Sequence, residues 1–193
     1  MPGVRGENLE AARASSLEAR VAAIEGRLEA GYDGRESSVS IVCFSGDWDR
    51  LFAALTIANG ALALGQEVHL FFTFWAASAL RDEAKTPAGR SFVDRLMKQC
   101  LPAGARRAPL SRMHWGGLGK VFIGWRMRKE NIEGIDTLLE RAREAGARFH
   151  LCETSASLLG LDCGELVGDG EIDPCGVTTF LGKALKGRMV LFI

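Results

Sequence analysis

The sequence predicts an α/β protein, a three-layer sandwich with helices on both faces of a mostly parallel sheet of four or five strands. Short apolar runs such as VSIVCF (39–44) and EVHLFFTF (67–74) are typical of strands that are buried on both faces. Segments with apolar residues at helical spacing separate these runs. Strands that alternate with helices in this way favour a parallel sheet with helical crossovers.

Each element is predicted from its apolar spacing and from the residues that bound it. The helix at 48–64 has apolar residues every three or four positions and is closed by Gly65. Pro87 divides the next helical region, an irregular connection covers 101–119, and a loop covers 164–173. The predicted strands are 39–44, 67–74, 147–151 and 188–193. The predicted helices are 48–64, 76–84, 88–99, 118–128, 132–145, 155–160 and 176–187.

An N-terminal segment, 1–37, precedes this domain, which we assign to 38–193. Within the segment, 7–30 has the 4-3-4 apolar spacing of a coiled coil, and GYDGRESS (31–38) has the composition of a linker. A coiled coil here would join identical subunits. The alternative is a frayed, charged tail, because a helix of barely two heptads is marginal in water. The apolar positions of the coiled-coil pattern are Leu17, Val21, Ile24 and Leu28.

Composition excludes several classes of function. Lys+Arg and Asp+Glu both number 24, so no overall basic field favours nucleic acid. No apolar run approaches the roughly 20 residues that span a bilayer, and the N-terminus lacks the apolar region of a signal peptide. We therefore expect a cytoplasmic protein without a transmembrane segment. The 5 cysteines include no CxxC pair and the 3 histidines are scattered, so we expect neither a disulfide framework nor a metal site.

Three segments are expected at the carboxyl edge of the sheet, where ligands bind in open α/β folds. They are the turn after the first strand, the end of the second strand, and the segment from Cys152 to Ser155 after the third. The fold would thus gather a thiol, a glycine turn and an aromatic side chain at one rim. The residues expected to line the pocket there are Ser45, Gly46, Asp47, Thr73 and Trp75.

Cys152 is the candidate nucleophile, because it lies where a strand turns into a helix. With Thr154 or Ser155 as the helix N-cap, the thiol would lie near unpaired N–H groups that stabilise an anion and lower its pKa. Ser155 completes a CxxS arrangement and could hydrogen-bond the thiolate. The alternative is an inert thiol packed in the core, since cysteine is among the most buried residue types. The residues alone leave both interpretations open.

The other cysteines have weaker patterns. Cys163 follows Cys152 by 11 residues and could act as a second, resolving thiol. Cys175 opens a helix and is the second choice for a nucleophile, although no predicted strand brings it to the rim. We expect Cys43 in the core, and Cys100 has no evident partner.

One predicted helix carries an aromatic and apolar stripe. It could lie on a membrane surface or close over the active edge, but a stripe buried in the domain or in a subunit interface is the favoured interpretation. His69 and His150 fall within strands and are expected to be hydrogen-bonded core residues, and nothing places His114 beside a thiol. The members of the stripe are Trp115, Leu118, Phe122 and Trp125.

The segment SGDWDRLFAALTIANGALALGQEVHLFFTFWA (45–76) resembles the opening of the DsrE/DsrF/DrsH-like family. The family's cysteine loop, C-x-x-S-x-x-x-x-G, is met here by Cys152, Ser155 and Gly160. The resemblance covers 38–193 and implies a flavodoxin-like, DsrE-like sandwich.

This resemblance also implies a sulfur carrier or sulfurtransferase in intracellular sulfur relay, with Cys152 accepting sulfane sulfur as a persulfide and passing it on. It implies no cofactor and no metal, a homo-oligomer such as a trimer or hexamer, and TusA-like or rhodanese-like partners. Two alternatives remain open at this point. One is a non-enzymatic assembly or regulatory module, and the other is a thiol-dependent, peroxiredoxin-like reductase that uses Cys152 with Cys163.

Overall fold

The computed structural model describes the following parts of the chain: 17–22, 25, 36–85, 92–113, 115–168 and 170–193. The chain divides into two compact units, Met1–Arg35 and Glu36–Ile193, and the fold below is that of the second. Most of the predicted coiled-coil helix lies outside the described residues. Its described part, 17–22, is helical, with Leu17 and Val21 exposed.

The second unit is built on a five-stranded parallel sheet in the order β4-β3-β2-β1-β5. This confirms the predicted α/β class with its parallel sheet. The strands are β1 (Glu36–Cys43), β2 (Glu67–Phe72), β3 (Arg148–Cys152), β4 (Ile172–Cys175) and β5 (Gly187–Phe192).

The α-helices of this unit are α2 (Trp48–Ala63), α3 (Phe92–Cys100), α4 (Leu118–Lys129), α5 (Ile135–Glu144), α6 (Glu153–Leu159) and α7 (Val177–Ala184). Short 3₁₀ helices are η1 (Phe74–Leu80), η2 (Ala105–Arg107), η3 (Trp115–Gly117) and η4 (Cys163–Glu165). The predicted helix at 76–84 is therefore the 3₁₀ helix η1, which begins directly after β2 and has five of its seven residues buried.

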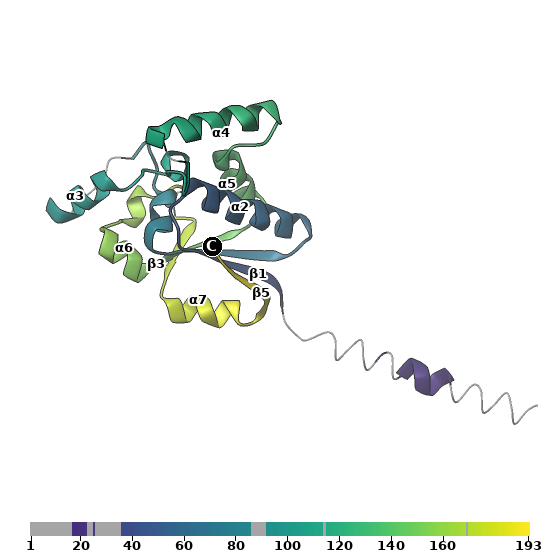
Figure 1. The fold of residues 1–193 in the computed structure, drawn as a ribbon. Helices are drawn as coiled ribbons and strands as arrows, with labels where there is room; N and C mark the ends of the chain where they lie inside the picture. Colours follow the sequence, from purple (N-terminus) through teal and green to yellow (C-terminus); the bar gives the residue numbers. More distant parts are fainter. Residues whose placement is uncertain (1–16, 23–24, 26–35, 86–91, 114, 169) are drawn as a thin grey trace, which may run out of the picture. The chain divides into compact units, whose positions relative to one another are not determined.

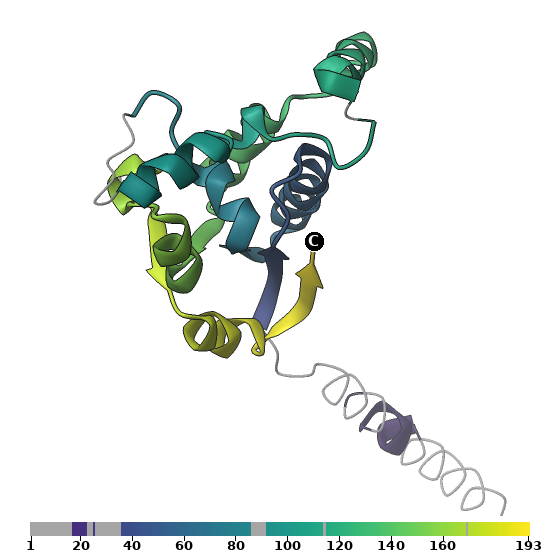
Figure 2. The same ribbon diagram turned by 60° about the vertical axis from the view of Figure 1, so that its left-hand side comes forward.

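The strand order explains the layers. The chain steps from β1 to β4 in one direction and then returns across the whole sheet to β5. Because crossovers between parallel strands are right-handed, the returning helix α7 must cover the opposite face. Figures 1 and 2 show α7 on one side of the sheet, with α2 and α5 packed together on the other.

Alternation along the strands divides the buried side chains between these two faces. Phe72 and Leu151 belong to the main core with α2 and α5. Phe71 and Cys152, their neighbours in the chain, point to the other side and pack with Phe180 of α7. The end of β3 therefore delivers Cys152 to the smaller cluster, beneath α7.

The strand β4 corrects the predicted loop at 164–173. Its four residues, Ile172–Cys175, pair only with β3 and form the edge of the sheet. Pro174 is tolerated there because the edge strand leaves one row of backbone groups without a ladder partner. A strand this short carries too little apolar alternation to be recognised from sequence.

The stripe, which runs from Trp115 in η3 to Trp125 in α4, is not buried in the domain, so that part of its favoured interpretation was wrong. Within α4 the buried residue is Gly119, and the helix lies on the outer side of α2 and α5 (Figure 1). The exposed fractions of the stripe are 65% for Trp115, 70% for Leu118, 52% for Phe122 and 50% for Trp125. In the described part of the chain, none of the helices has the length and apolar character to cross a membrane.

Candidate functional site

Cys152 is the last residue of β3 and the N-cap of α6. The helix begins at Glu153, earlier than the predicted 155–160, so the cap is Cys152 itself and not Thr154 or Ser155. Its backbone is extended, with φ −65 and ψ 114, as the first position before a helix requires. Its side chain makes no capping hydrogen bond. The backbone N–H groups of Thr154 and Ser155 therefore lie where an anion at this position would accept them.

The surroundings of Cys152 favour its thiolate. Burial opposes the charge, since the residue is 2% exposed. A thiolate at this position is stabilised by the Ser155 side chain and backbone, the Thr73 hydroxyl and the Thr154 backbone, and this stabilisation outweighs burial and lowers the pKa of Cys152 below its ordinary value. A thiol with a lowered pKa supplies the thiolate, which is the nucleophilic form.

Ser155 links three parts of this site. Its hydroxyl lies 2.9 Å from the Thr73 hydroxyl and accepts the backbone N–H of Phe74 at 2.9 Å. Phe74 has a φ of 49, an uncommon conformation for an aromatic residue, directly at the end of β2. The Ser155 hydroxyl thus holds the strained backbone of Phe74 and also stabilises the Cys152 thiolate.

The predicted pocket residues lie in two places. Ser45 donates to Asp47 at 2.8 Å and accepts the Asp47 N–H at 3.1 Å, which closes the turn after β1. Gly46 packs against Trp75, where a Cβ would lie 2.8 Å from the backbone oxygen. Together with Trp75 this turn lines a hollow of about 240 Å³.

Neither Cys152 nor Thr73 is among the residues that line this hollow. Thr73 instead lies beside Ser155 and the thiol. The hollow and the Cys152 thiol are separate because side chains at the strand ends alternate between the two faces of the sheet. Cys43 packs in the main core, whereas Cys152 packs on the face covered by α7.

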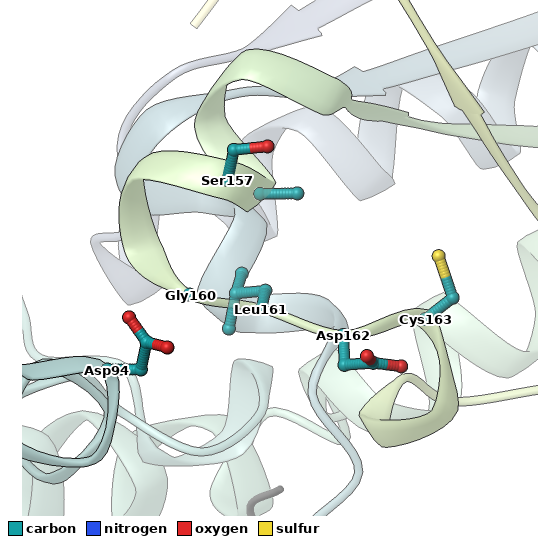
Figure 3. Close-up of a pocket in the computed structure, with 7 residues that line it drawn as sticks. Asp94, Ser157, Gly160, Leu161, Asp162 and Cys163 are labelled. Carbon is teal, nitrogen blue, oxygen red and sulfur yellow. The ribbon is translucent and has the colours of Figure 1, made fainter. Parts of the chain in front are cut away.

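Cys163 lies apart from Cys152. It is exposed and lines a hollow of about 390 Å³ that also contains Asp162 and Gly160. Figure 3 shows that Asp94 of α3 reaches this hollow from the side opposite Cys163. Cys152 is not among the lining residues.

The cysteine that the fold does bring to Cys152 is Cys175. The two are register partners on β3 and β4, and both belong to the cluster beneath α7. The sequence does not predict β4, so it also does not predict that Cys175 lies beside Cys152. Burial, reinforced by Asp173 and by Glu153 and Cys152, raises the pKa of the Cys175 thiol.

Two buried histidines lie on the same face of the sheet as Cys152 and Cys175. His69 Nδ1 lies 3.1 Å from His150 Nε2, and His150 Nδ1 lies 3.1 Å from Asp173 Oδ2. Both rings are buried, as predicted for core histidines. Burial, with the nearby Lys183, lowers the pKa of His150 against the opposing effect of Asp173.

Among the described residues, one group has donor atoms close enough to hold a metal ion: His150, Asp173 and Cys175, within 4.8 Å of one another. Asp173 already has a cation, because Lys183 Nζ lies 3.4 Å from its Oδ2. Burial raises the pKa of the Cys175 thiol, whose proton a metal ion would have to displace. His150 and Asp173 lie within hydrogen-bond distance of each other, and the Cys175 sulfur lies within 4.8 Å of both donor atoms.

Comparisons with known proteins identify relatives over most of the chain. The chain is 40% identical over 154 residues to the uncharacterized protein YrkE of Bacillus subtilis (strain 168), covering 80% of this chain and 95% of that protein. It is 23% identical over 165 residues to the sulfur carrier protein DsrE2 of Allochromatium vinosum, covering 82% of this chain and 99% of that protein. The family model described as DsrE/DsrF/DrsH-like matches residues 35–192. The chain therefore belongs to the DsrE/DsrF/DrsH-like family.

Proposed function

We propose that this protein is a cytoplasmic sulfur carrier that accepts sulfane sulfur as a persulfide on Cys152. The observation that carries the proposal is the position of Cys152 at the junction of β3 and α6, among hydrogen-bond donors that lower its pKa. The sulfur carrier named among its relatives, at 23% identity, supports the same class of function.

The chemistry needs no cofactor. The Cys152 thiolate attacks the sulfane sulfur of a donor persulfide, a new S–S bond forms, and the bond between that sulfur and the donor breaks. The donor leaves as a thiolate, so no net oxidation or reduction occurs. Ser155 and Thr73 stabilise the thiolate before attack and again after the sulfur has been passed to an acceptor.

Sulfur transfer by this route implies protein partners that present or receive a persulfide. We propose TusA-like and rhodanese-like proteins for these roles and a homo-oligomer, such as a trimer or hexamer, as the working form. A reductase that uses Cys152 with Cys163 has less support, because Cys163 lines a hollow that does not include Cys152.

The experiment is sulfur loading followed by intact mass measurement. Because Cys152 is 2% exposed, the donor is small: inorganic polysulfide, applied without oxygen and then removed by desalting. The wild type and the matched control Cys163→Ser should gain one sulfur atom, and Cys152→Ser should gain none. Equal uptake by Cys152→Ser would exclude Cys152 as the acceptor.

A second candidate function is supported by a different observation, the exposed stripe on η3 and α4. In a non-enzymatic assembly module this stripe would join subunits or a partner protein. Changing Trp115 and Trp125 together to serine should then lower the mass measured by light scattering, while loading at Cys152 is unchanged. An unchanged mass would count against assembly through α4.

A further inference from the structure

Cys152 and Cys175 are paired across two adjacent strands. They are register partners in the parallel pairing of β3 with β4, so their side chains project to the same face of the sheet. Neighbouring strands lie about 4.8 Å apart, which falls within the Cα separations of roughly 4.4–6.8 Å that a disulfide spans. Both are free thiols, 2% and 5% exposed, packed with Phe71 and Phe180.

The two thiols differ in their protonation. Burial is outweighed at Cys152 by the surrounding hydrogen-bond donors, which stabilise the thiolate, and its pKa is lowered. At Cys175 burial is reinforced by Asp173 and by Glu153, and the pKa is raised. Cys152 is therefore the thiol that is ready to accept sulfur, while Cys175 keeps its proton beside it.

A group that can accept the Cys175 proton is also in place. The donor atoms of His150, Asp173 and Cys175 lie within 4.8 Å of one another. The lowered pKa of His150 keeps its ring neutral, and Lys183 lies 3.4 Å from the Asp173 carboxylate. The pair formed by His150 and Asp173 therefore lies near the Cys175 thiol and receives its proton as the S–S bond forms, since the shifted pKa values disfavour transfer before the attack.

From this arrangement we propose that Cys175 is the resolving thiol of the Cys152 persulfide. The Cys175 sulfur attacks Cys152 Sγ and a disulfide forms between the two residues. The bond from Cys152 Sγ to the sulfane sulfur breaks, and that sulfur leaves as hydrosulfide. The proton passes from Cys175 through the His150–Asp173 pair to the leaving hydrosulfide.

The step is balanced without another oxidant. The sulfane sulfur is reduced to sulfide, and the Cys175 thiol is oxidised to half of the disulfide. Return to the two thiols requires an external dithiol reductant of the thioredoxin class. The protein would then release sulfide as well as hold sulfane sulfur. This inference rests on the proposed persulfide at Cys152.

The test uses full-length protein that has been chelated, reduced, loaded with polysulfide and desalted without oxygen. In the wild type, the sulfur adduct should convert to a form two hydrogen atoms lighter than the reduced protein, with one equivalent of sulfide released. Cys175→Ser should keep its adduct at least tenfold longer and form no disulfide. Cys163→Ser is the matched control and should behave as the wild type.

Digestion after glutamate locates the bond, because Glu153, Glu165 and Glu171 separate Cys152, Cys163 and Cys175 into different peptides. The expected product joins the Cys152 and Cys175 peptides. A linkage to Cys163, or sulfide release from Cys175→Ser at the wild-type rate, would overturn the proposal. Cys175→Ala, with its fold checked by circular dichroism, repeats the comparison without introducing a buried hydroxyl.

The two proposals fail separately. If the wild type gains no sulfur, or Cys152→Ser gains as much, the persulfide at Cys152 is refuted. If loading is normal but the adduct neither decays nor yields a disulfide, the resolving role of Cys175 is refuted and the carrier function stands.

Discussion

The hydroxyls of Thr73 and Ser155 lie 2.9 Å apart and join the end of β2 to the first turn of α6. Ser155 also accepts the N–H of Phe74, whose φ is 49. Both hydroxyls lower the pKa of Cys152. The reactivity of the Cys152 thiol and the backbone conformation at Phe74 therefore depend on the same pair of hydroxyl side chains.

Removing the Ser155 hydroxyl should slow the reaction of Cys152. A hydrogen bond to a charged group contributes about 1.5–3 kcal/mol, so Ser155→Ala should raise the thiol pKa and reduce the thiolate at neutral pH roughly tenfold or more. The measurement is the rate of iodoacetamide alkylation of Cys152 against pH, read by mass spectrometry. Ser157→Ala on the same helix is the matched control. Identical profiles for Ser155→Ala and wild type would contradict this assignment.

The buried thiol of Cys43 should make the fold sensitive to alkali. Burial raises the pKa of Cys43 from 9.0 to about 12, so the folded state keeps this proton after the unfolded state has released it. The free energy of unfolding should therefore fall as pH rises from 9.0 to about 12, by about 1.4 kcal/mol per pH unit for this group. Below pH 9.0 the contribution of Cys43 is constant.

Urea unfolding at neutral and alkaline pH measures this slope, because the midpoint reports stability when the denaturant dependence is unchanged. Cys43→Ala should be less stable at neutral pH, since it leaves a small cavity, but should lose less stability above pH 9.0. An equally steep loss in wild type and variant would assign the alkaline sensitivity to other groups.

A buried ion pair connects α3 with the 3₁₀ helix η4, which follows α6. Lys98 donates to Glu165, and the two residues are 3% and 4% exposed. Arg81 lies beside them and donates to the backbone oxygen of Lys98 at 3.1 Å. Lys98→Met leaves the Glu165 carboxylate buried without its ammonium partner and should cost about 3–5 kcal/mol of unfolding free energy.

The double variant Lys98→Met with Glu165→Leu should recover only part of that loss, because it removes both charges of the pair but leaves the buried Arg81 without the attraction of the Glu165 carboxylate. Urea denaturation of the wild type, the two single variants and the double variant completes the thermodynamic cycle. Strictly additive losses would mean that the two side chains are not coupled.

The sequence was sufficient for those features that depend on local pattern. The apolar runs that became β1, β2 and β3 were recognisable because strands buried on both faces contain few polar residues. The position of Cys152 followed from a strand that ends beside a helical pattern. The predicted start of α6, Ser155, is later than the observed start, Glu153, because the prediction takes Thr154 or Ser155 as the N-cap and not Cys152.

Features set by pairing between distant segments were not predictable in the same way. Cys175 is 23 residues beyond Cys152, and only the pairing of β4 with β3 makes them neighbours. Cys163 is closer in sequence, but it is an exposed residue of the 3₁₀ helix η4, beyond the end of α6. Distance along the chain does not indicate which cysteine is paired with Cys152, because strand register is fixed by the whole sheet.

The proposal that Cys152 carries the sulfur is tested most directly by locating the added atom. Protein loaded with polysulfide is alkylated at once, digested after glutamate and analysed by mass spectrometry, which reads Cys152, Cys163 and Cys175 on separate peptides. We predict that the extra sulfur lies on the peptide that contains Cys152. Extra sulfur on the Cys163 or Cys100 peptide, with Cys152 carrying only the alkyl group, would contradict the account.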